Sequence, residues 1–379
     1  MAGRSAKSKA AKSKAGNDRP LAVVVLAAGE GKRMRSQRAK VLHEVAGKSM
    51  ICHVLDTVER LRPERTVVVV GHQAEAVRDA VGDRAACALQ ERQLGTGDAV
   101  RTARSRLRGF SGDVLVVCGD VPLLRAASCR RLLRLHRKAS ALATVLSMQV
   151  EDPTGYGRIL RGEGGSVRIV EDADADADER TIDEVNTGTY CFDASFLWRA
   201  LSSLGRDNAQ REYYLTDVVE MASERGRAGV VLLDDDCEGW GVNSRLDLAR
   251  VEAAAQERLI MAAMDRGVTF LDPTTAYLSS DTRIGADTVI GPNVRIEGRT
   301  VIGRNCRIDG TAHIADCRIG DRVHVRWGVV ACEARIGEGA IVGPYSHLRP
   351  LADLGRDVHI GNFVEVKKSK IGDRSKANH

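Results

Sequence analysis

The sequence predicts an α/β domain with a mostly parallel sheet, followed by a connecting helix and a left-handed parallel β-helix of hexapeptide repeats. Two observations support this prediction. Apolar runs alternate with helical stretches from residue 20 to about 245, and aliphatic residues recur every six positions after Pro273. We therefore expect a disordered basic tail over 1–18, an α/β domain over 19–244, a linker helix over 245–268 and a β-helix over 269–379.

The α/β domain is indicated by continuous Val- and Leu-rich runs, which are typical of parallel strands that are covered on both faces. These runs span 21–28, 65–71, 113–120, 142–150 and 229–236. Helical stretches such as 50–61 and 129–139 separate them. Because ligands of such domains bind outside the carboxyl ends of the strands, the residues that follow each run are the first candidates for a site.

The linker and the repeat follow. Residues 245–267 are rich in Ala, Leu, Glu and Arg, and Gly267 suits a helix C-terminus. Beyond Pro273 a six-residue period fits neither a helix nor an isolated strand, but it is the signature of stacked β-helix coils. The expected inward positions are Ile284, Ile290, Ile296, Ile302, Ile308, Ile314, Ile319, Val325, Val330, Ile336, Val342, Leu348, Leu354, Ile360, Val366 and Ile371.

Composition limits the function classes. The formal net charge of +6 comes mainly from residues 1–17, so the rest of the chain is nearly neutral, and only 4% of residues are aromatic. This balance disfavours nucleic-acid binding, and no apolar run reaches the ~20 residues of a membrane span. The nine cysteines lack C-x-x-C spacing, which indicates reduced core residues in a cytoplasmic protein. The acidic run 172–179 is expected to be a solvated loop.

The stretch VVVLAAGEGKRMRSQRAKVLH, residues 23–43, places a Gly-rich turn and several cations directly after a strand. It lacks the third glycine of a dinucleotide fingerprint and the Ser or Thr of a P-loop. What remains is a turn with two glycines that lets backbone N–H groups approach phosphate, followed by cations that neutralise it. Asp120 ends the run 113–120, where a carboxylate suits Mg²⁺.

Residues 26–43 resemble the L-A-A-G-x-G-x-R-M-x-S-x-x-x-K signature of sugar-1-phosphate nucleotidylyltransferases. Further segments, in order, are LQERQLGTGDAV, CGDVPLL, DPTGYGRI, IVEDADA, EVNTG, NAQREYYLTDVV and GWGVNSR. Together with the hexapeptide half, they resemble the bifunctional N-acetylglucosamine-1-phosphate uridylyltransferase/glucosamine-1-phosphate acetyltransferase family over residues 20–379. Ala39 stands where that family usually has Pro.

The resemblance implies a Rossmann-like nucleotidyltransferase domain that uses Mg²⁺ to convert UTP and N-acetylglucosamine 1-phosphate to UDP-N-acetylglucosamine and pyrophosphate. By the same resemblance, Arg33 and Lys40 hold the α-phosphate and the departing pyrophosphate, and Asp120 and Asn243 are the metal ligands. The product then serves cell-wall precursor synthesis. The other implied nucleotide- and sugar-binding residues are Leu26, Ala27, Ala28, Gly29, Gly31, Gln90, Gln93, Gly95, Thr96, Gly157, Glu171, Asn186 and Thr187.

The β-helix half carries the family's second reaction, in which acetyl-CoA acetylates glucosamine 1-phosphate. The resemblance assigns sugar-phosphate contacts to Arg349 and Lys367 and the general base to His379. Because the chain stops at His379, we expect an incomplete β-helix with lost or impaired acetyl transfer, and acetyl-CoA as a substrate only if that domain is completed. A homotrimer through the β-helix is also implied.

Two other functions stay open. The first is a nucleotidylyltransferase for another sugar 1-phosphate, although the segments NAQREYYLTD and DPTGYGRI favour N-acetylglucosamine. The second is a hexapeptide-repeat scaffold or acyltransferase whose first half only binds nucleotide. The set Arg33, Lys40, Asp120 and Asn243 argues against this second alternative.

Overall fold

The computed structural model describes residues 19–379, so the basic tail predicted over 1–18 lies outside the described residues. The chain forms two compact units. The first comprises the residues up to His43 together with Ser49–Val251, and the second comprises Glu44–Lys48 together with Glu252–His379. The short segment Glu44–Lys48 thus groups with the β-helix, although the sequence pattern suggested no separation from its neighbours.

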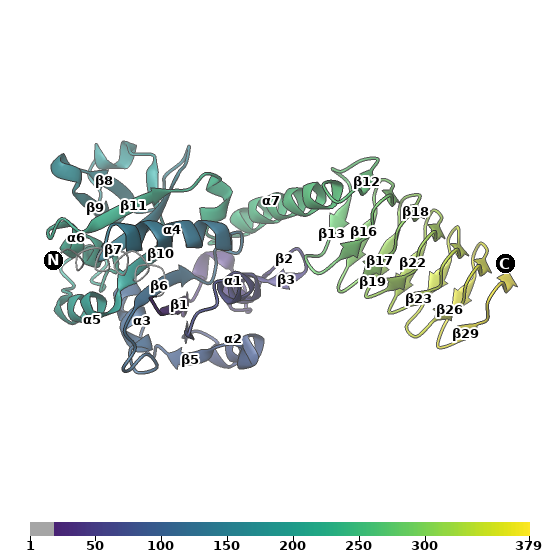
Figure 1. Ribbon diagram of the computed structural model, residues 1–379, viewed down its shortest axis with the longest axis horizontal. Coiled ribbons are helices and arrows are strands. Elements are labelled where there is room, and N and C mark those ends of the chain that lie inside the picture. Colours follow the sequence, from purple (N-terminus) through teal and green to yellow (C-terminus); the bar gives the residue numbers. More distant parts are fainter. Residues whose placement is uncertain (1–18) are drawn as a thin grey trace, which may run out of the picture. The chain divides into compact units, whose positions relative to one another are not determined.

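The first unit is built on a nine-stranded sheet whose main path is β11-β7-β10-β6-β1-β4-β5, with β8 beside β10 and β9 beside β8 (Figure 1). β10 runs antiparallel to both β6 and β7, whereas the other neighbours along the path are parallel, so the predicted mostly parallel sheet is confirmed. The strands are β1 (Leu21–Ala27), β4 (Arg65–Val70), β5 (Ala86–Leu89), β6 (Asp113–Cys118), β7 (Ala143–Gln149), β8 (Arg158–Arg161), β9 (Val167–Val170), β10 (Glu184–Asp193) and β11 (Ala228–Leu232).

Helices cover both faces of this sheet because successive side chains of each strand point to opposite faces. Val24 of β1 packs in one apolar cluster with Val100, Leu197 and Val219, whereas Val25 packs in another with Ile51 and Leu132. The helices are α1 (Met50–Glu59), α2 (Ala74–Val81), α3 (Thr96–Ala103), α4 (Ala126–Lys138), α5 (Ala194–Ser203) and α6 (Thr216–Ser223), with short 3-10 turns η1 (Lys32–Met34), η2 (Lys40–Leu42), η3 (Gly82–Arg84), η4 (Glu163–Gly165), η5 (Glu179–Thr181) and η6 (Asp236–Gly239).

The order of the strands brings the ends of β1 and β6 together. β1 pairs in parallel with β4 on one side and with β6 on the other. The strands that follow β1 are therefore added first on one side of it and later on the other, which makes β1 the point where the strand order reverses. Gly119, just after β6, donates a backbone hydrogen bond of 2.8 Å to the Leu26 carbonyl near the end of β1. The carboxyl edge at this reversal is the place where open α/β sheets bind ligands.

A long helix, α7 (Arg245–Met264), begins in the first unit and ends in the second. It ends near Gly267, which has a φ of +88° and donates a backbone hydrogen bond to Met264. A short pair of strands, β2 (Glu44–Val45) and β3 (Lys48–Ser49), precedes α1. Within the second unit, the Ala46 N–H donates to Glu252 at 2.7 Å and the Lys48 ammonium pairs with Asp281 at 2.7 Å.

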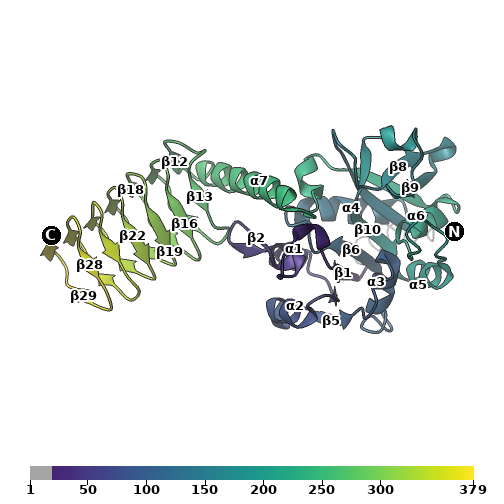
Figure 2. The same ribbon diagram turned by 180° about the vertical axis from the view of Figure 1, so that it is seen from behind.

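The second unit is a left-handed parallel β-helix made of three sheets, as the hexapeptide period predicts. Figure 2 shows the strands of the second sheet following one another along the coil. The first sheet contains β12 (Thr269–Phe270), β15 (Val289–Ile290), β18 (Arg307–Ile308), β21 (His324–Val325), β24 (Ile341–Val342), β27 (His359–Ile360) and β30 (Lys376–Ala377). The second contains β13 (Tyr277–Leu278), β16 (Arg295–Glu297), β19 (His313–Ala315), β22 (Val330–Cys332), β25 (His347–Leu348) and β28 (Glu365–Val366). The third contains β14 (Arg283–Ile284), β17 (Val301–Ile302), β20 (Arg318–Ile319), β23 (Arg335–Ile336), β26 (Asp353–Leu354) and β29 (Lys370–Ile371).

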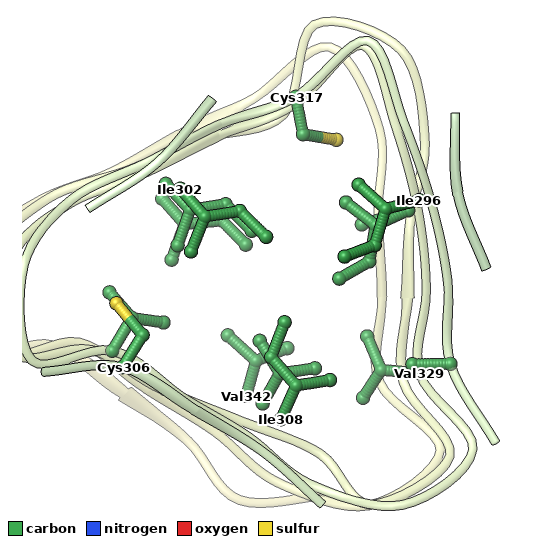
Figure 3. Packing of buried hydrophobic residues seen from close by; sticks show 14 of the residues in the cluster. Ile296, Ile302, Cys306, Ile308, Cys317, Val329 and Val342 are labelled. Carbon is green, nitrogen blue, oxygen red and sulfur yellow. The ribbon is translucent and has the colours of Figure 1, made fainter. Parts of the chain in front are cut away.

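Each coil places one aliphatic side chain from each sheet on the axis. Ile296, Ile302 and Ile308 point inward from the three sides in Figure 3 and are at most 2% exposed. Burial of each such side chain stabilises the coil by about 2 kcal/mol. One predicted position is wrong: Ala331 rather than Val330 points inward, because Ala331 pairs with Ile314 and Leu348 in the ladder. The short step of five residues therefore falls after residue 331.

The sequence also predicts that the cysteines are reduced core residues and that the chain has no membrane span. All nine cysteines are free thiols, and four of them are buried. Within residues 19–379, none of the helices is long and apolar enough to cross a membrane.

Candidate active site

The turn after β1 is shaped by a glycine in a left-handed conformation. Leu26 and Ala27 end β1, and Ala28 and Gly29 continue into the turn, with Gly29 exposed. Gly31 has a φ of +66°, and a Cβ atom at this position would lie only 2.7 Å from the Lys40 Cβ. Gly31 thus lets Lys40 pack directly against the turn. Because φ is positive and the space is filled, only glycine fits here without a shift of the backbone.

Lys40, Asp120 and Asn243 come together at the carboxyl edge of the sheet. The Lys40 ammonium donates to Asp120 Oδ2 and, at 3.1 Å, to Asn243 Oδ1. The side chains of Lys40 and Asp120 are only 14% and 16% exposed, so this ion pair is largely removed from water. Two oxygen atoms from distant parts of the chain therefore converge on one cationic nitrogen.

Backbone contacts hold this cluster in place. Val242 donates to the Asp120 carbonyl at 3.0 Å, which ties the segment before Asn243 to the end of β6. Asp247 Oδ2 accepts hydrogen bonds from the backbone N–H groups of Asn243 and Ser244, at 3.0 and 2.8 Å. The Ser244 hydroxyl in turn accepts from the Asp247 N–H at 3.2 Å. This reciprocal arrangement is a capping box at the start of α7.

The loop that precedes Lys40 is held by Gln73. Its side-chain carbonyl accepts from the Ala39 N–H at 2.9 Å, and its amide donates to the Gln37 carbonyl. Met34 is buried and anchors the first half of the loop, whereas Arg33 is exposed and makes no hydrogen bond or ion pair with any residue of 19–379. Ala39 is 2% exposed. Gln73 thus holds the loop at Ala39, the position where the related family usually has proline.

The predicted uridine-binding segment lies beside the same turn. Gln93 is exposed and donates its side-chain amide to the Ala28 carbonyl at 3.0 Å. Gln90 is buried, and its amide donates to Asp98 at 2.9 Å. Gly95 has a φ of +106°, and a Cβ atom there would lie 2.6 Å from the Tyr213 carbonyl. The Thr96 hydroxyl accepts from the Leu215 N–H at 3.0 Å.

The predicted sugar-binding residues gather around β10. Asn186 donates its backbone N–H to the Gly157 carbonyl at 2.8 Å, and its side-chain amide donates to Tyr190 at 2.6 Å. Glu171 accepts from the Thr216 hydroxyl at 3.0 Å, and burial raises the pKa of its carboxyl above the ordinary value. The Thr187 hydroxyl donates to the Leu146 carbonyl, so this group is already engaged within the sheet.

The three predicted residues of the β-helix are not all brought together. Arg349 and Lys367 follow β25 and β28, which are adjacent rungs of one sheet, and Arg349 pairs with Glu365 at 2.8 Å. His379 follows β30 in another sheet and is exposed. Within the described residues, His379 makes no hydrogen bond or ion pair with Arg349 or Lys367.

The acidic run 172–179 is more engaged than a solvated loop. Asp172 pairs at 2.8 Å with Arg158, whose side chain is 2% exposed. Asp174 accepts hydrogen bonds from the Tyr214 hydroxyl and the Ala209 N–H, at 3.0 and 2.8 Å. The run is a loop, as predicted, and most of it, Asp174 included, is exposed. Asp172 departs from the prediction, because a buried guanidinium needs a nearby carboxylate.

Comparison with known proteins agrees with this architecture. A family model described as nucleotidyl transferase matches residues 22–241, and the model of the GMPPB C-terminal domain matches residues 273–374. A solved Bacillus anthracis structure, described as a glucose-1-phosphate thymidylyltransferase in complex with a sucrose, superposes with a TM-score of 0.51 at 18% identity. It covers 62% of this chain and 95% of its own chain, and at this identity it shows only the fold.

Curated relatives give the family. The bifunctional protein GlmU of Heliobacterium modesticaldum is 49% identical over 360 residues, which are 94% of this chain and 78% of the relative. GlmU of Enterococcus faecalis is 47% identical over 358 residues, with the same coverage of 94% and 78%. The chain belongs to the GlmU family. It is therefore a nucleotidyltransferase that transfers a uridylyl group to N-acetylglucosamine 1-phosphate.

Several residues that shape this GlmU-family site were missed by sequence reasoning. Gln73 holds the loop before Lys40, but a glutamine on a distant loop carries no local signal. Asp247 positions Asn243, and here a signal was present, because the spacing Ser244-x-x-Asp247 is that of a capping box. Tyr156 lies against Gly241, and burial raises the pKa of its hydroxyl.

Proposed function

We propose that the cluster at the carboxyl edge of β1 and β6 is the active site for uridylyl transfer from UTP to N-acetylglucosamine 1-phosphate. The observation that carries this proposal is the convergence of Lys40, Asp120 and Asn243 beside the glycine turn. Such a site combines backbone N–H groups, a cation and two oxygen ligands at one point. That combination suits the polyphosphate of a nucleotide.

The same cluster fits a magnesium ion. Asp120 Oδ2 and Asn243 Oδ1 both contact the single Lys40 Nζ atom, so both oxygens are within reach of one small cation. Magnesium prefers such hard oxygen ligands and usually completes its shell with water and substrate phosphate. Residues 19–379 hold no cluster of three or more His, Cys, Asp or Glu side chains suited to a metal, which agrees with a site completed by the nucleotide.

When bound there, magnesium would neutralise charge on the phosphates of UTP. The residues of the chain would contribute by binding and orienting the substrates. The N–H groups around Gly29 and Gly31 would hold the nucleotide, and Lys40 and the exposed Arg33 would hold the α-phosphate and the leaving pyrophosphate. The sugar phosphate oxygen attacks the α-phosphorus, and the bond to the pyrophosphate oxygen breaks. No protein nucleophile is required, because positioning and charge neutralisation lower the barrier.

Recognition of the two substrates is assigned to the flanking segments. Gln93, Gly95 and Thr96 border the turn, where an amide can donate to and accept from the uracil edge. Gly157, Glu171 and Asn186 would form the sugar side. A Cβ atom at Gly157 would lie 3.1 Å from the Ile169 side chain and 3.4 Å from the Glu171 carboxylate, so Gly157 lies directly beside both side chains.

Pyrophosphate release from UTP and N-acetylglucosamine 1-phosphate in the presence of Mg²⁺ tests this assignment. Asp120→Asn keeps the shape of the side chain and removes the charge, and we expect a loss of about 10²-fold or more in kcat/KM. Asp79→Asn is the matched control, because Asp79 is exposed on α2 and makes no side-chain contact with another described residue. Undiminished release by Asp120→Asn would refute the assignment.

The rival sugar substrates are separated by the same assay. Glucose 1-phosphate, galactose 1-phosphate and N-acetylglucosamine 1-phosphate are each supplied with UTP. In a second series, UTP and the other nucleoside triphosphates are each supplied with N-acetylglucosamine 1-phosphate. We expect the N-acetylglucosamine pair to give the highest kcat/KM. A higher value for another sugar would leave the site assignment intact but change the substrate.

The β-helix contributes two further proposals. We expect weak acetyl transfer to glucosamine 1-phosphate, because no described residue holds the ring of His379, and a general base needs a fixed orientation. We also propose a homotrimer through the β-helix. Trp327, Tyr345 and Phe363 are 46%, 58% and 76% exposed, and the rings of Tyr345 and Phe363 stack at 5.8 Å. An acetylation assay and the sedimentation of the intact chain test these two proposals.

A further inference from the structure

A cavity of about 450 Å³ lies in the first unit at the amino edge of the sheet, at the opposite end of β1 from the glycine turn. Arginine side chains dominate its wall: Arg19, Arg62, Arg130, Arg134 and Arg137. They come from the entry to β1, the turn after α1 and the helix α4. Among the described residues that line the cavity, Glu64 is the only carboxylate, and it lies 3.6 Å from Arg65.

Two of these arginines are paired with carboxylates that do not themselves line the cavity. Asp113 is fully buried at the start of β6, and it pairs with Arg137 at 2.6 Å and with Arg19 at 3.2 Å. Arg19 also pairs with Asp193 at 2.7 Å. These carboxylates fix the positions of two guanidinium groups at the cavity wall. A preorganised wall lowers the entropy cost of binding a ligand.

Within residues 19–379, no carboxylate pairs with the other cations of the wall. Arg62 and Arg134 are exposed, and the structure shows no hydrogen bond or ion pair from either side chain to another residue of 19–379. Arg130 donates only to the Arg60 carbonyl, at 2.5 Å. Several guanidinium groups thus line one cavity and keep N–H donors that no described residue accepts. Guanidinium groups bind phosphate oxygens in pairs and are favoured wherever phosphate is recognised.

We propose that this cavity binds a small polyanionic phosphate at a second site, separate from the nucleotide turn. The cationic wall would hold the phosphates, and the leucines that also line the cavity, Leu21, Leu61 and Leu133, would contact an apolar part such as a nucleoside. The site stands on the geometry of this cavity and is independent of the proposed function. β1 and β6 begin at the cavity and end at the glycine turn and Asp120, so one sheet carries both sites.

Inorganic tripolyphosphate, added to the full chain in the presence of EDTA, is the first probe. Amide hydrogen exchange locates its binding. We expect slower exchange in peptides that cover 59–65 and 130–138, independently of any protection in the peptide that covers 28–40. Protection confined to the 28–40 peptide would overturn the proposal. ATP is then compared with tripolyphosphate: tighter binding of ATP at the cavity indicates a nucleotide, and equal binding indicates the phosphate chain alone.

A double variant separates a built site from general charge attraction. Arg62→Asn/Arg134→Gln should weaken binding at the cavity about tenfold or more, because each lost guanidinium contact contributes to affinity. Asn tolerates the φ of +54° at position 62, so the turn is kept. Arg104→Asn/Arg199→Gln is the control, since it removes two exposed arginines elsewhere and retains the basic residues 1–17. Equal losses in the two double variants would overturn the proposal, and uridylyl transfer should be unchanged in both.

Discussion

The ammonium group of Lys40 lies between Asp120 Oδ2 and Asn243 Oδ1, the two oxygen atoms proposed to hold magnesium. In the protein alone, Lys40 therefore supplies the positive charge that these oxygens need in a partly buried place. A metal held by Asp120 and Asn243 would compete with Lys40 for these oxygens, and the lysine would then be free to turn toward phosphate. This competition leads to the first prediction.

Lys40→Met should lower kcat/KM for uridylyl transfer by about 10²-fold, because a phosphate contact of the transition state is lost. The same variant should bind Mn²⁺, a spectroscopic substitute for Mg²⁺, more tightly than the unchanged protein in the absence of nucleotide. Electron paramagnetic resonance of free Mn²⁺ measures this affinity. Lys138→Met, an exposed lysine at the end of α4, should change neither quantity. Weaker Mn²⁺ binding by Lys40→Met would contradict the competition.

Gly31→Ala should damage catalysis through Lys40. The new methyl group would meet the Lys40 Cβ at 2.7 Å on a backbone with a φ of +66°, so the lysine must shift. We expect kcat/KM to fall about tenfold or more, since small displacements of positioning groups are costly. Gly82→Ala is the control, because Gly82 also has a positive φ, +55°, but has no atom within 4 Å of the added Cβ. Equal activity in the two variants would contradict an effect of the added Cβ on Lys40.

His136 should make the first unit sensitive to acid. Burial lowers the pKa of His136 from 6.5 to about 4, although Asp113 opposes this effect. Between these two values the unfolded chain binds a proton that the folded chain does not. The free energy of unfolding should therefore fall as the pH drops from 6.5 to 4, by up to about 1.4 kcal/mol per pH unit.

Urea unfolding at pH 7 and pH 5 measures this slope. His136→Gln should flatten it, whatever its effect at pH 7, because glutamine does not titrate. His379→Gln replaces an exposed histidine and should keep the slope of the unchanged protein. An unaltered slope in His136→Gln would assign the acid sensitivity to other groups.

Asp172→Asn should destabilise the first unit. It leaves the Arg158 guanidinium, 2% exposed, without its carboxylate partner. We expect the free energy of unfolding to fall by about 1–3 kcal/mol, less than for a fully buried pair because Asp172 is itself partly exposed. Asp178→Asn in the same acidic run is the control, since no side-chain contact of Asp178 is present among the described residues. Thermal unfolding of both variants decides whether the run is structural at Asp172.

Much of the architecture is local and could be predicted from the sequence. Period-six aliphatics identify a β-helix because each coil repeats the same burial requirement, and the Val-rich runs identify strands that are buried on both faces. The antiparallel strand β10 was not among the predicted runs. Its sequence, EVNTGTYCFD, mixes polar and apolar residues, and its pairing with β6 and β7 is a long-range choice.

The residue types and their spacing identify the chemical groups that this protein carries: a glycine turn for phosphate, cations after it, a carboxylate at a strand end and a repeat of stacked coils. The fold alone brings Lys40 to Asp120, 80 residues away, and to Asn243, 203 residues away. It also decided that Ala331, and not Val330, faces the axis. Contacts between distant segments depend on the strand order, the register and the packing of the whole unit. A local pattern of residues does not specify these long-range relations.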